Sequence, residues 1–139
     1  MAYSWDKSLE TGNLEIDSQH RSLVDAINNL LDACSQGKGR NEVEKTLKFL
    51  QDYVVKHFSD EEKLQIKSNY PDYKAHKEKH EAFKKEVNEI AEEFKKGGAT
   101  IQLVARVNSS VAGWLISHIK SEDKKVAAHI KIVKIMIID

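Results

Sequence analysis

Apolar residues recur along most of this chain at intervals of three and four, which is the period of one face of an α-helix. The pattern predicts four helices. The first covers about residues 18–36, the second opens at Asn41, the third covers about 72–96, and the fourth runs from about Thr100 into the 120s. Glycines or a turn sequence separate each helix from the next. Four helices with short connections favour an all-α fold, an up-down-up-down antiparallel four-helix bundle.

Both ends of the chain depart from this pattern. Residues 1–17 lack helical periodicity, so we expect an irregular N-terminal arm, with Asp17 or Ser18 capping the first helix. Residues 130–139 are apolar and rich in β-branched side chains. They could extend the last helix, fold back on the bundle or pair with another copy. With 139 residues in all, we expect a single domain that spans 1–139.

Histidines and acidic residues interrupt the apolar stripes. On the second helix, an almost unbroken heptad pattern leads from Val43 to His57 and Glu61, so both polar residues are expected in the core. Similar interruptions occur on every helix. The full set is His20, His57, Glu61, His76, His80, His118 and Asp123. Neighbouring helices of the bundle run in opposite directions, so the helix ends that carry these residues coincide. We therefore expect one polar layer, with the opposite half of the bundle purely apolar.

Composition and charge exclude several classes of partner. Lys plus Arg and Asp plus Glu each number 22, so the formal net charge is zero and we expect neither nucleic acid nor a membrane surface as partner. No apolar run approaches the length of a transmembrane helix, and the first residues lack the features of a signal peptide. A single cysteine, Cys34, fits a reducing compartment, so we expect a cytoplasmic protein.

The seven polar core residues predict a metal site. Buried polar groups without partners destabilise a fold. A histidine that is simply hydrogen-bonded in the core could account for one such residue, but it accounts poorly for a set that comes from four helices. Imidazole and carboxylate without thiolate suit iron, while zinc, copper and nickel stay open. Seven ligands are too many for one tetrahedral zinc. Two octahedral metals bridged by Glu61, Asp123 and an oxo or hydroxo group would use them better and would leave one coordination position for a small diatomic ligand.

The spacing of these residues resembles that of the hemerythrin family, in particular the single-domain bacteriohemerythrins. The matching motifs are His20, His57-x3-Glu61, His76-x3-His80 and His118-x4-Asp123. The surrounding residues Trp5, Gly12, Ile16-Asp17-x-Gln19-His20, Tyr70-Pro71 and Trp114-Leu115-x-x-His118-Ile119 are also similar to that family. Members of the family bind molecular oxygen reversibly at a non-haem di-iron site.

The resemblance implies a role for each ligand of two iron ions. His76, His80 and His118 would hold the coordinatively saturated iron. His20 and His57 would hold the iron with the vacant position, and Glu61 and Asp123 would bridge the two.

Two apolar residues of the fourth helix are candidates for the wall of an oxygen pocket. Leu115 precedes His118 by three residues and Ile119 precedes Asp123 by four, which places both on the ligand face. Both also continue the apolar stripe, so core packing is the alternative interpretation. The sixth histidine, His129, matches no ligand position and is expected in solvent, while Cys34 is expected as a small buried hydrophobe.

The sequence thus favours an oxygen-binding protein used for carriage, storage or sensing, and not an enzyme. The alternatives are a di-iron oxidase or peroxidase-like enzyme, or a nitric-oxide-binding protein. Ferritin-like di-iron proteins use Glu-x-x-His motifs. This sequence contains none, and its site is rich in nitrogen, which counts against oxygen activation.

Overall fold

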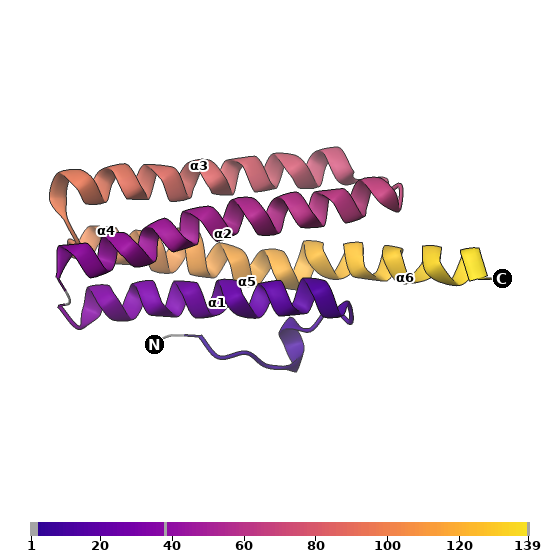
Figure 1. The fold of residues 1–139 in the computed structure, drawn as a ribbon, viewed down its shortest axis with the longest axis horizontal. Coiled ribbons are helices and arrows are strands. Elements are labelled where there is room, and N and C mark those ends of the chain that lie inside the picture. The colour runs from indigo at the N-terminus through magenta and orange to yellow at the C-terminus, as the bar shows by residue number, and fades with distance from the viewer. Residues whose placement is uncertain (1–2, 38, 139) are drawn as a thin grey trace.

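A computed structural model describes residues 3–37 and 39–138, with side chains as far as residue 134. Over these residues the fold is all-α, and four helical rods run antiparallel to one another (Figure 1). The first three rods are α1 (Leu14–Ser35), α2 (Arg40–Lys67) and α3 (Tyr73–Gly97). The fourth rod joins α4 (Ile101–Arg106), the π-helix η2 (Val107–Gly113), α5 (Trp114–His118), the π-helix η3 (Ile119–Asp123) and α6 (Lys124–Ile138). The predicted fold class is confirmed.

The N-terminal arm is shorter than expected. It contains a short 3₁₀-helix, η1 (Lys7–Leu9), and ends where α1 begins at Leu14, not near residue 18. The cap is Asn13, whose side chain accepts a hydrogen bond from the backbone N–H of Ile16 at 3.0 Å. Asp17, expected as a cap, instead accepts hydrogen bonds from the backbone of the arm that precedes the helix.

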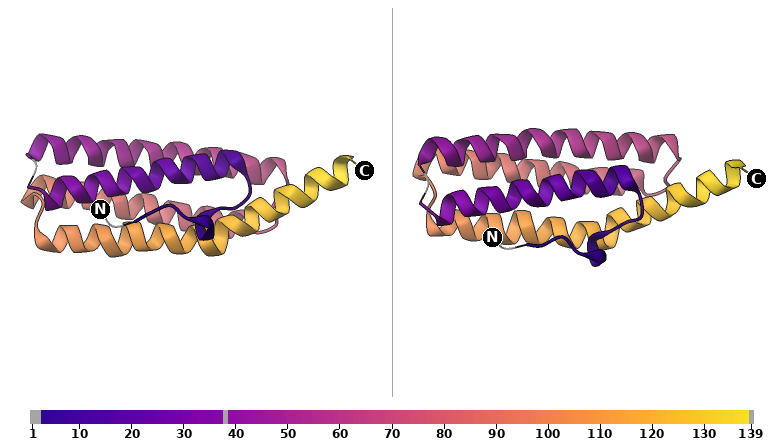
Figure 2. Two further views of the ribbon diagram at one scale, coloured as in Figure 1. Left: turned by 90° about the horizontal axis from the view of Figure 1, so that it is seen from below. Right: turned by 60° about the horizontal axis from the view of Figure 1, so that its bottom comes forward.

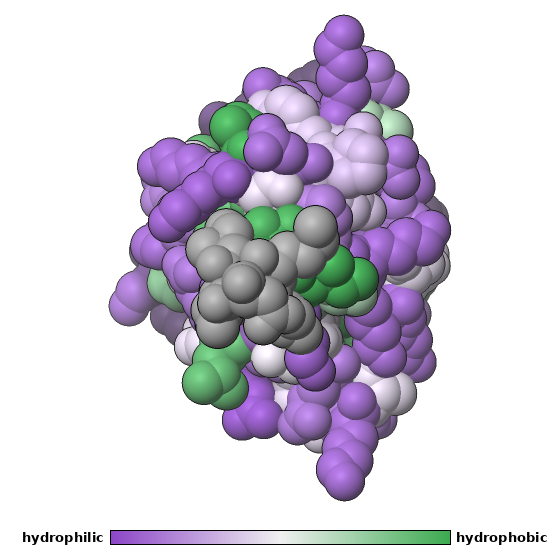
Figure 3. Space-filling model, turned by 90° about the vertical axis from the view of Figure 1, so that its right-hand side faces the viewer, coloured by the Kyte–Doolittle hydropathy of each residue, from purple (hydrophilic) through white to green (hydrophobic). Residues whose placement is uncertain are grey.

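The C-terminal tail takes one of the three courses left open, because α6 continues as a helix to Ile138 and projects beyond the other rods (Figure 2). Asp139 lies outside the described residues. Val126 and Ile130 at the base of α6 are buried, and a groove of about 880 Å³ separates this base from the start of α1. Figure 3 looks onto this end, where hydrophobic residues lie among hydrophilic ones. No helix of the described chain is both long and apolar enough to cross a bilayer.

Two separate apolar clusters stabilise the bundle. The large one fills the half nearest the α1–α2 connection and reaches Phe58 on α2 and Leu115 on α5. A small one, Ile16, Tyr70, Val126 and Ile130, closes the other end. On α1 and on the fourth rod the polar core residues lie between members of these two clusters, and on α2 and α3 they lie between the large cluster and the turn that holds Tyr70. The polar layer is therefore sealed on both sides, where the sequence predicted an apolar half on one side only.

Two residues outside the layer differ from expectation. His129 is half-buried, with its Nε2 at 2.7 Å from the carbonyl oxygen of Ser68 and its ring against that of Tyr70. The expectation of a solvated histidine was therefore wrong. Cys34 packs against the large cluster, as expected, but is only half-buried.

Candidate metal centre

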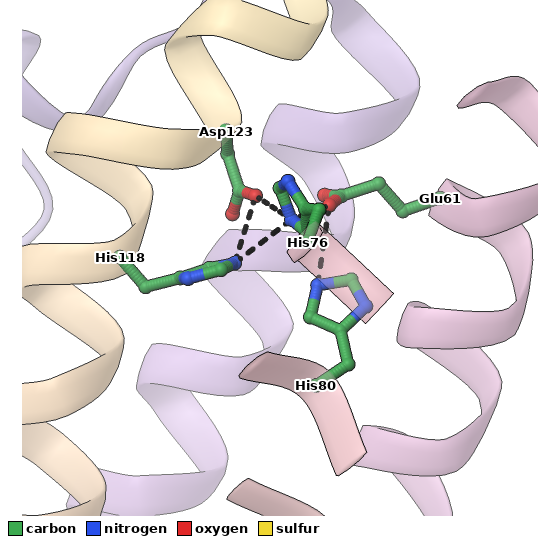
Figure 4. Close-up of side chains that lie close together, drawn as sticks. All are labelled: Glu61, His76, His80, His118 and Asp123. Carbon is green, nitrogen blue, oxygen red and sulfur yellow. Dashed lines mark hydrogen bonds and ion pairs between the residues drawn. The ribbon is translucent and has the colours of Figure 1, made fainter. Parts of the chain in front are cut away.

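The seven polar residues predicted from the sequence lie together in the core. Each is between 0 and 4% exposed. They come from all four rods: His20 from α1, His57 and Glu61 from α2, His76 and His80 from α3, His118 from α5 and Asp123 from η3. Figure 4 shows five of them pointing toward one another from three of the rods.

Their ligand atoms form two overlapping groups. One group holds three histidines with both carboxylates: Glu61, His76, His80, His118 and Asp123. The other holds two histidines with the same carboxylates: His20, His57, Glu61 and Asp123. Within each group the ligand atoms lie within 4.8 Å of one another. The arrangement is therefore that of two adjacent sites that share two acidic residues.

The carboxylate of Glu61 divides its oxygens between the two groups. Oε1 lies 2.8 Å from Nε2 of His76 and 3.4 Å from Nε2 of His80. Oε2 lies 3.6 Å from Nε2 of His57 and 3.8 Å from Nε2 of His20. Each oxygen therefore faces a different set of imidazoles.

Asp123 is divided in the same way. Its Oδ1 lies 3.1 Å from Nε2 of both His76 and His118, and its Oδ2 lies 2.9 Å from Nε2 of His20. Two carboxylates that each present one oxygen to either group have the geometry of bridging ligands.

Asp123 reaches the site because the fourth rod is not a regular α-helix. On an α-helix, five residues correspond to about 140° of rotation beyond a full turn, so a regular α-helix would turn Asp123 away from the face of His118. The segment between them, η3, is a π-helix. Its wider turn brings the two side chains onto one face.

Hydrogen bonds donated by Nδ1–H orient two of the imidazoles. Gln19 donates its amide N–H to Asp60 at 2.9 Å, so its carbonyl oxygen faces His57 and accepts from Nδ1–H at 2.7 Å. His80 donates Nδ1–H to the carboxylate of Glu62 at 2.8 Å. Both rings therefore keep the Nε2 lone pair free and directed into the site, as metal-binding histidines do.

Aromatic rings stack on two of the imidazoles. The ring of Phe58 lies parallel to that of His80, with centroids 3.8 Å apart. Trp114 stacks on His118 at 4.4 Å. These contacts restrict the rotation of each imidazole and keep water from its face.

The electrostatics reflect the burial of opposite charges. Burial lowers the pKa of His57 to about 4, so this ring is neutral at pH 7. Burial also disfavours a charge on His76, but the close contacts of its Nε2 with Asp123 and Glu61 outweigh it and raise its pKa to about 9. Burial would raise the pKa of Asp123, yet its contacts with His118, His20 and His76 hold it well below the usual value. Without metal, the site thus contains a protonated His76 between two carboxylates.

Several buried atoms of the site have no hydrogen-bond partner within the described chain. They are both ring nitrogens of His20, Nε2 of His57, Oε2 of Glu61, Nδ1 of His76, Nε2 of His80 and both oxygens of Asp123. Buried polar atoms without partners are uncommon and need an explanation. Metal cations between the imidazoles and carboxylates would satisfy most of them, so the residues fit a metal centre.

Three polar residues around the site were not given a role from the sequence. Gln19 and Glu62 orient histidines, and Gln65 is fully buried beside Glu61. Only Gln65 had a usable signal, since it follows Glu61 by four residues and so shares its helix face. Leu115 and Ile119, the candidates for the pocket wall, are both buried in the large apolar cluster.

Comparisons with known proteins agree with this geometry. The model of the hemerythrin HHE cation binding domain matches residues 11–130. The bacteriohemerythrin of Pseudomonas aeruginosa is 34% identical over 119 residues, which cover 86% of this chain and 75% of the relative. That of Methylococcus capsulatus is 35% identical over 108 residues, covering 78% and 80%. The crystal structure of wild-type hemerythrin superposes with a TM-score of 0.83 at 30% identity and covers 94% of this chain and 98% of its own. The chain belongs to the hemerythrin family.

Proposed function

We propose that this protein binds molecular oxygen reversibly at a pair of iron ions held by the seven buried residues. The observation that carries the proposal is the orientation of the carboxylates of Glu61 and Asp123. Each directs one oxygen to one group of histidines and its other oxygen to the second group. Hemerythrin domains bind non-haem iron, and the nitrogen-rich donor set suits that metal. A ferrous pair supplies the electrons that reversible binding of oxygen requires.

The two groups of ligands would serve the ions unequally. His76, His80 and His118 give three imidazoles to one ion, whereas His20 and His57 give two to the other. With the carboxylates shared, the second ion is one protein ligand short, and that position is the one we assign to oxygen.

The surroundings favour a carrier over an enzyme. Among the described residues, the buried polar and charged side chains are the seven of the site and Gln65. Beyond the ligands, the described residues thus include no buried carboxylate or lysine side chain that could donate protons to bound oxygen, as a general acid does in catalysis. The two apolar clusters on either side of the layer keep bulk water away. Both features slow the conversion of bound oxygen into products.

The direct test is iron analysis with optical spectroscopy. We expect two ions per chain after expression with ample iron, and spectra that differ among the reduced, air-exposed and azide-treated protein. Removing oxygen should restore the spectrum of the reduced state. A single tightly held zinc ion, or no metal at all, would contradict the proposal.

Metal uptake should release a proton from His76. Its pKa of about 9 keeps the imidazole charged at pH 7, and the charge must leave before Nε2 can bind a cation. We expect anaerobic addition of Fe²⁺ in weak buffer to release about one proton per chain at this site near pH 7. The apparent affinity of the protein for Fe²⁺ should rise with pH and level off above about pH 9. Uptake without proton release at pH 7 would contradict this prediction.

Shortening Leu115 or Ile119 to alanine should accelerate oxidation of the oxygenated protein by admitting water. Leu115 also lines a small apolar crevice beside Tyr3 of the N-terminal arm, which makes it the stronger candidate. The measurement is the decay of the oxygenated spectrum in air, with iron content checked in parallel. Leu103→Ala is the matched control, because it removes an equally buried leucine of the same rod and costs about 2–5 kcal/mol of stability in the same way. Equal decay in all three variants would mean that these residues only pack the core.

A further inference from the structure

Among the described residues, Gln65 is the one buried polar residue that the proposed iron centre does not use as a ligand. It lies on α2 one turn after Glu61, and its side chain is 0% exposed. Its amide nitrogen Nε2 donates a hydrogen bond to Oε1 of Glu61 at 3.3 Å. Its carbonyl oxygen is buried and has no hydrogen-bond partner within the described chain.

The orientation of the amide follows from the charge beside it. An ionised Glu61 accepts hydrogen bonds only, so the NH₂ group of Gln65 and not its carbonyl must face the carboxylate. Burying an amide with an unpaired carbonyl destabilises a fold, and an apolar residue of the same length would avoid that cost. Packing alone therefore does not account for glutamine at this position.

The hydrogen bond reaches one particular oxygen of the bridge. Oε1 of Glu61 is the atom that faces His76 and His80, whereas Oε2 faces His57 and His20. Neither oxygen of Asp123 has a hydrogen-bond partner within the described chain. Of the two shared carboxylates, Glu61 alone therefore carries an amide donor, and it does so on the side of the three histidines.

We propose that Gln65 is a positioning and tuning residue for the iron centre, which draws electron density from Oε1 of Glu61 through its amide N–H. This inference rests on the proposed function, since it assigns Glu61 as a bridge. A carboxylate whose charge is shared with a hydrogen-bond donor is a weaker electron donor to a metal. The hydrogen bond from Gln65 would thus favour the ferrous state, raise the midpoint potential of the iron centre and slow its loss of electrons to oxygen.

The test replaces Gln65 with methionine, which has the same length and no N–H donor. We expect Gln65→Met to retain both irons and to have a lower midpoint potential in an anaerobic titration with one-electron mediators. In air, the ferrous ions lose electrons to dioxygen, and this oxidation should be about tenfold faster in the variant. That factor is at the lower end of the range for removing a residue that hydrogen-bonds to a metal ligand. The metal-free variant should melt no lower than metal-free wild type, because the unpaired carbonyl is gone.

Ile16→Val is the control for packing. Ile16 is 1% exposed in the apolar cluster at the same end, and its truncation should alter the melting temperature without moving the potential. An unchanged potential and oxidation rate in Gln65→Met, with iron intact, would overturn the inference. Loss of iron from both Gln65→Met and Gln65→Leu would also overturn it, because a tuning residue acts on a centre that forms without it. If wild type holds two irons but does not bind oxygen reversibly, the proposed function fails while the shift in potential can still be measured.

Discussion

Replacing Glu61 with alanine should reduce the iron content from two ions per chain to one or none and abolish the spectrum of the pair. Each oxygen of Glu61 faces one group of histidines, so its loss removes a ligand from both ions at once. In the metal-free protein it also removes one of the two carboxylates beside the charged His76. Leaving a buried charge without its partner typically costs about 3–5 kcal/mol. The measurements are elemental analysis and absorption spectra of the purified variant.

The neighbouring glutamate provides a matched control. Glu62→Ala removes a carboxylate one position along the same helix that contacts only Nδ1 of His80 within the site. We expect this variant to bind iron about 10–100-fold more weakly but to keep the paired spectrum when saturated. If Glu61→Ala retained both ions and reversible oxygen binding, its assignment as a bridge would be wrong.

Removing the metal should lower the melting temperature by an amount on the order of 10 °C. A ligand that binds only the folded state, present at about 1,000 times its Kd, adds about 4 kcal/mol, and each kcal/mol corresponds to about 2–4 °C for a chain near this size. Removal also leaves the imidazoles and carboxylates of the layer buried with incomplete hydrogen bonding. Paired melts of the iron-loaded and chelator-treated protein, followed by circular dichroism, test the prediction.

The loosening should be local. The part of the large apolar cluster around Leu50 and Val87 lies about two helical turns from the nearest ligands on α2 and α3, so amides there should stay protected from hydrogen exchange in the metal-free protein. Amides around His118 and Asp123 should exchange faster. Equal melting temperatures with and without metal, or uniform loss of protection, would contradict this account.

Much of the fold could be predicted because the residues that recur at the helical period in the sequence are the ones buried in the structure. The stripe Val43, Leu47, Leu50 and Val54 on α2 is buried as its heptad spacing indicated, and so are the polar residues that continue it. The start of α1 was placed too late because Leu14, at 88% exposed, adds nothing to an apolar face. That helix turn is fixed by a side-chain cap at Asn13, a local hydrogen bond that periodicity does not reveal.

The seven site residues could be identified from spacing, because neighbours one turn apart share a helix face. The residues that orient their imidazole rings could not be identified in this way. Gln19 reaches His57 across 38 positions of sequence, and Glu62 reaches His80 across 18. Such contacts depend on the rotation of one helix against another, which the spacing within a helix does not determine. The roles of Gln19 and Glu62 can therefore be recognised only once the helices are packed.

The π-helical turn before Asp123 makes the number of residues in this segment a property of the site in its own right. The spacing of five residues between His118 and Asp123 keeps both side chains on one face only while η3 stays π-helical. If one residue such as Ser121 were deleted, the same face would be kept only by a change to a regular α-helix, in which residues four apart are neighbours. An insertion would lengthen the spacing to six residues, about 240° beyond a full turn of an α-helix, and would carry Asp123 off that face. Substitutions at exposed Lys120 and Ser121 should be tolerated far better than such an insertion. A designer who grafts this centre onto a regular helical bundle must therefore either transplant the π-helical turn or place the two ligands four residues apart.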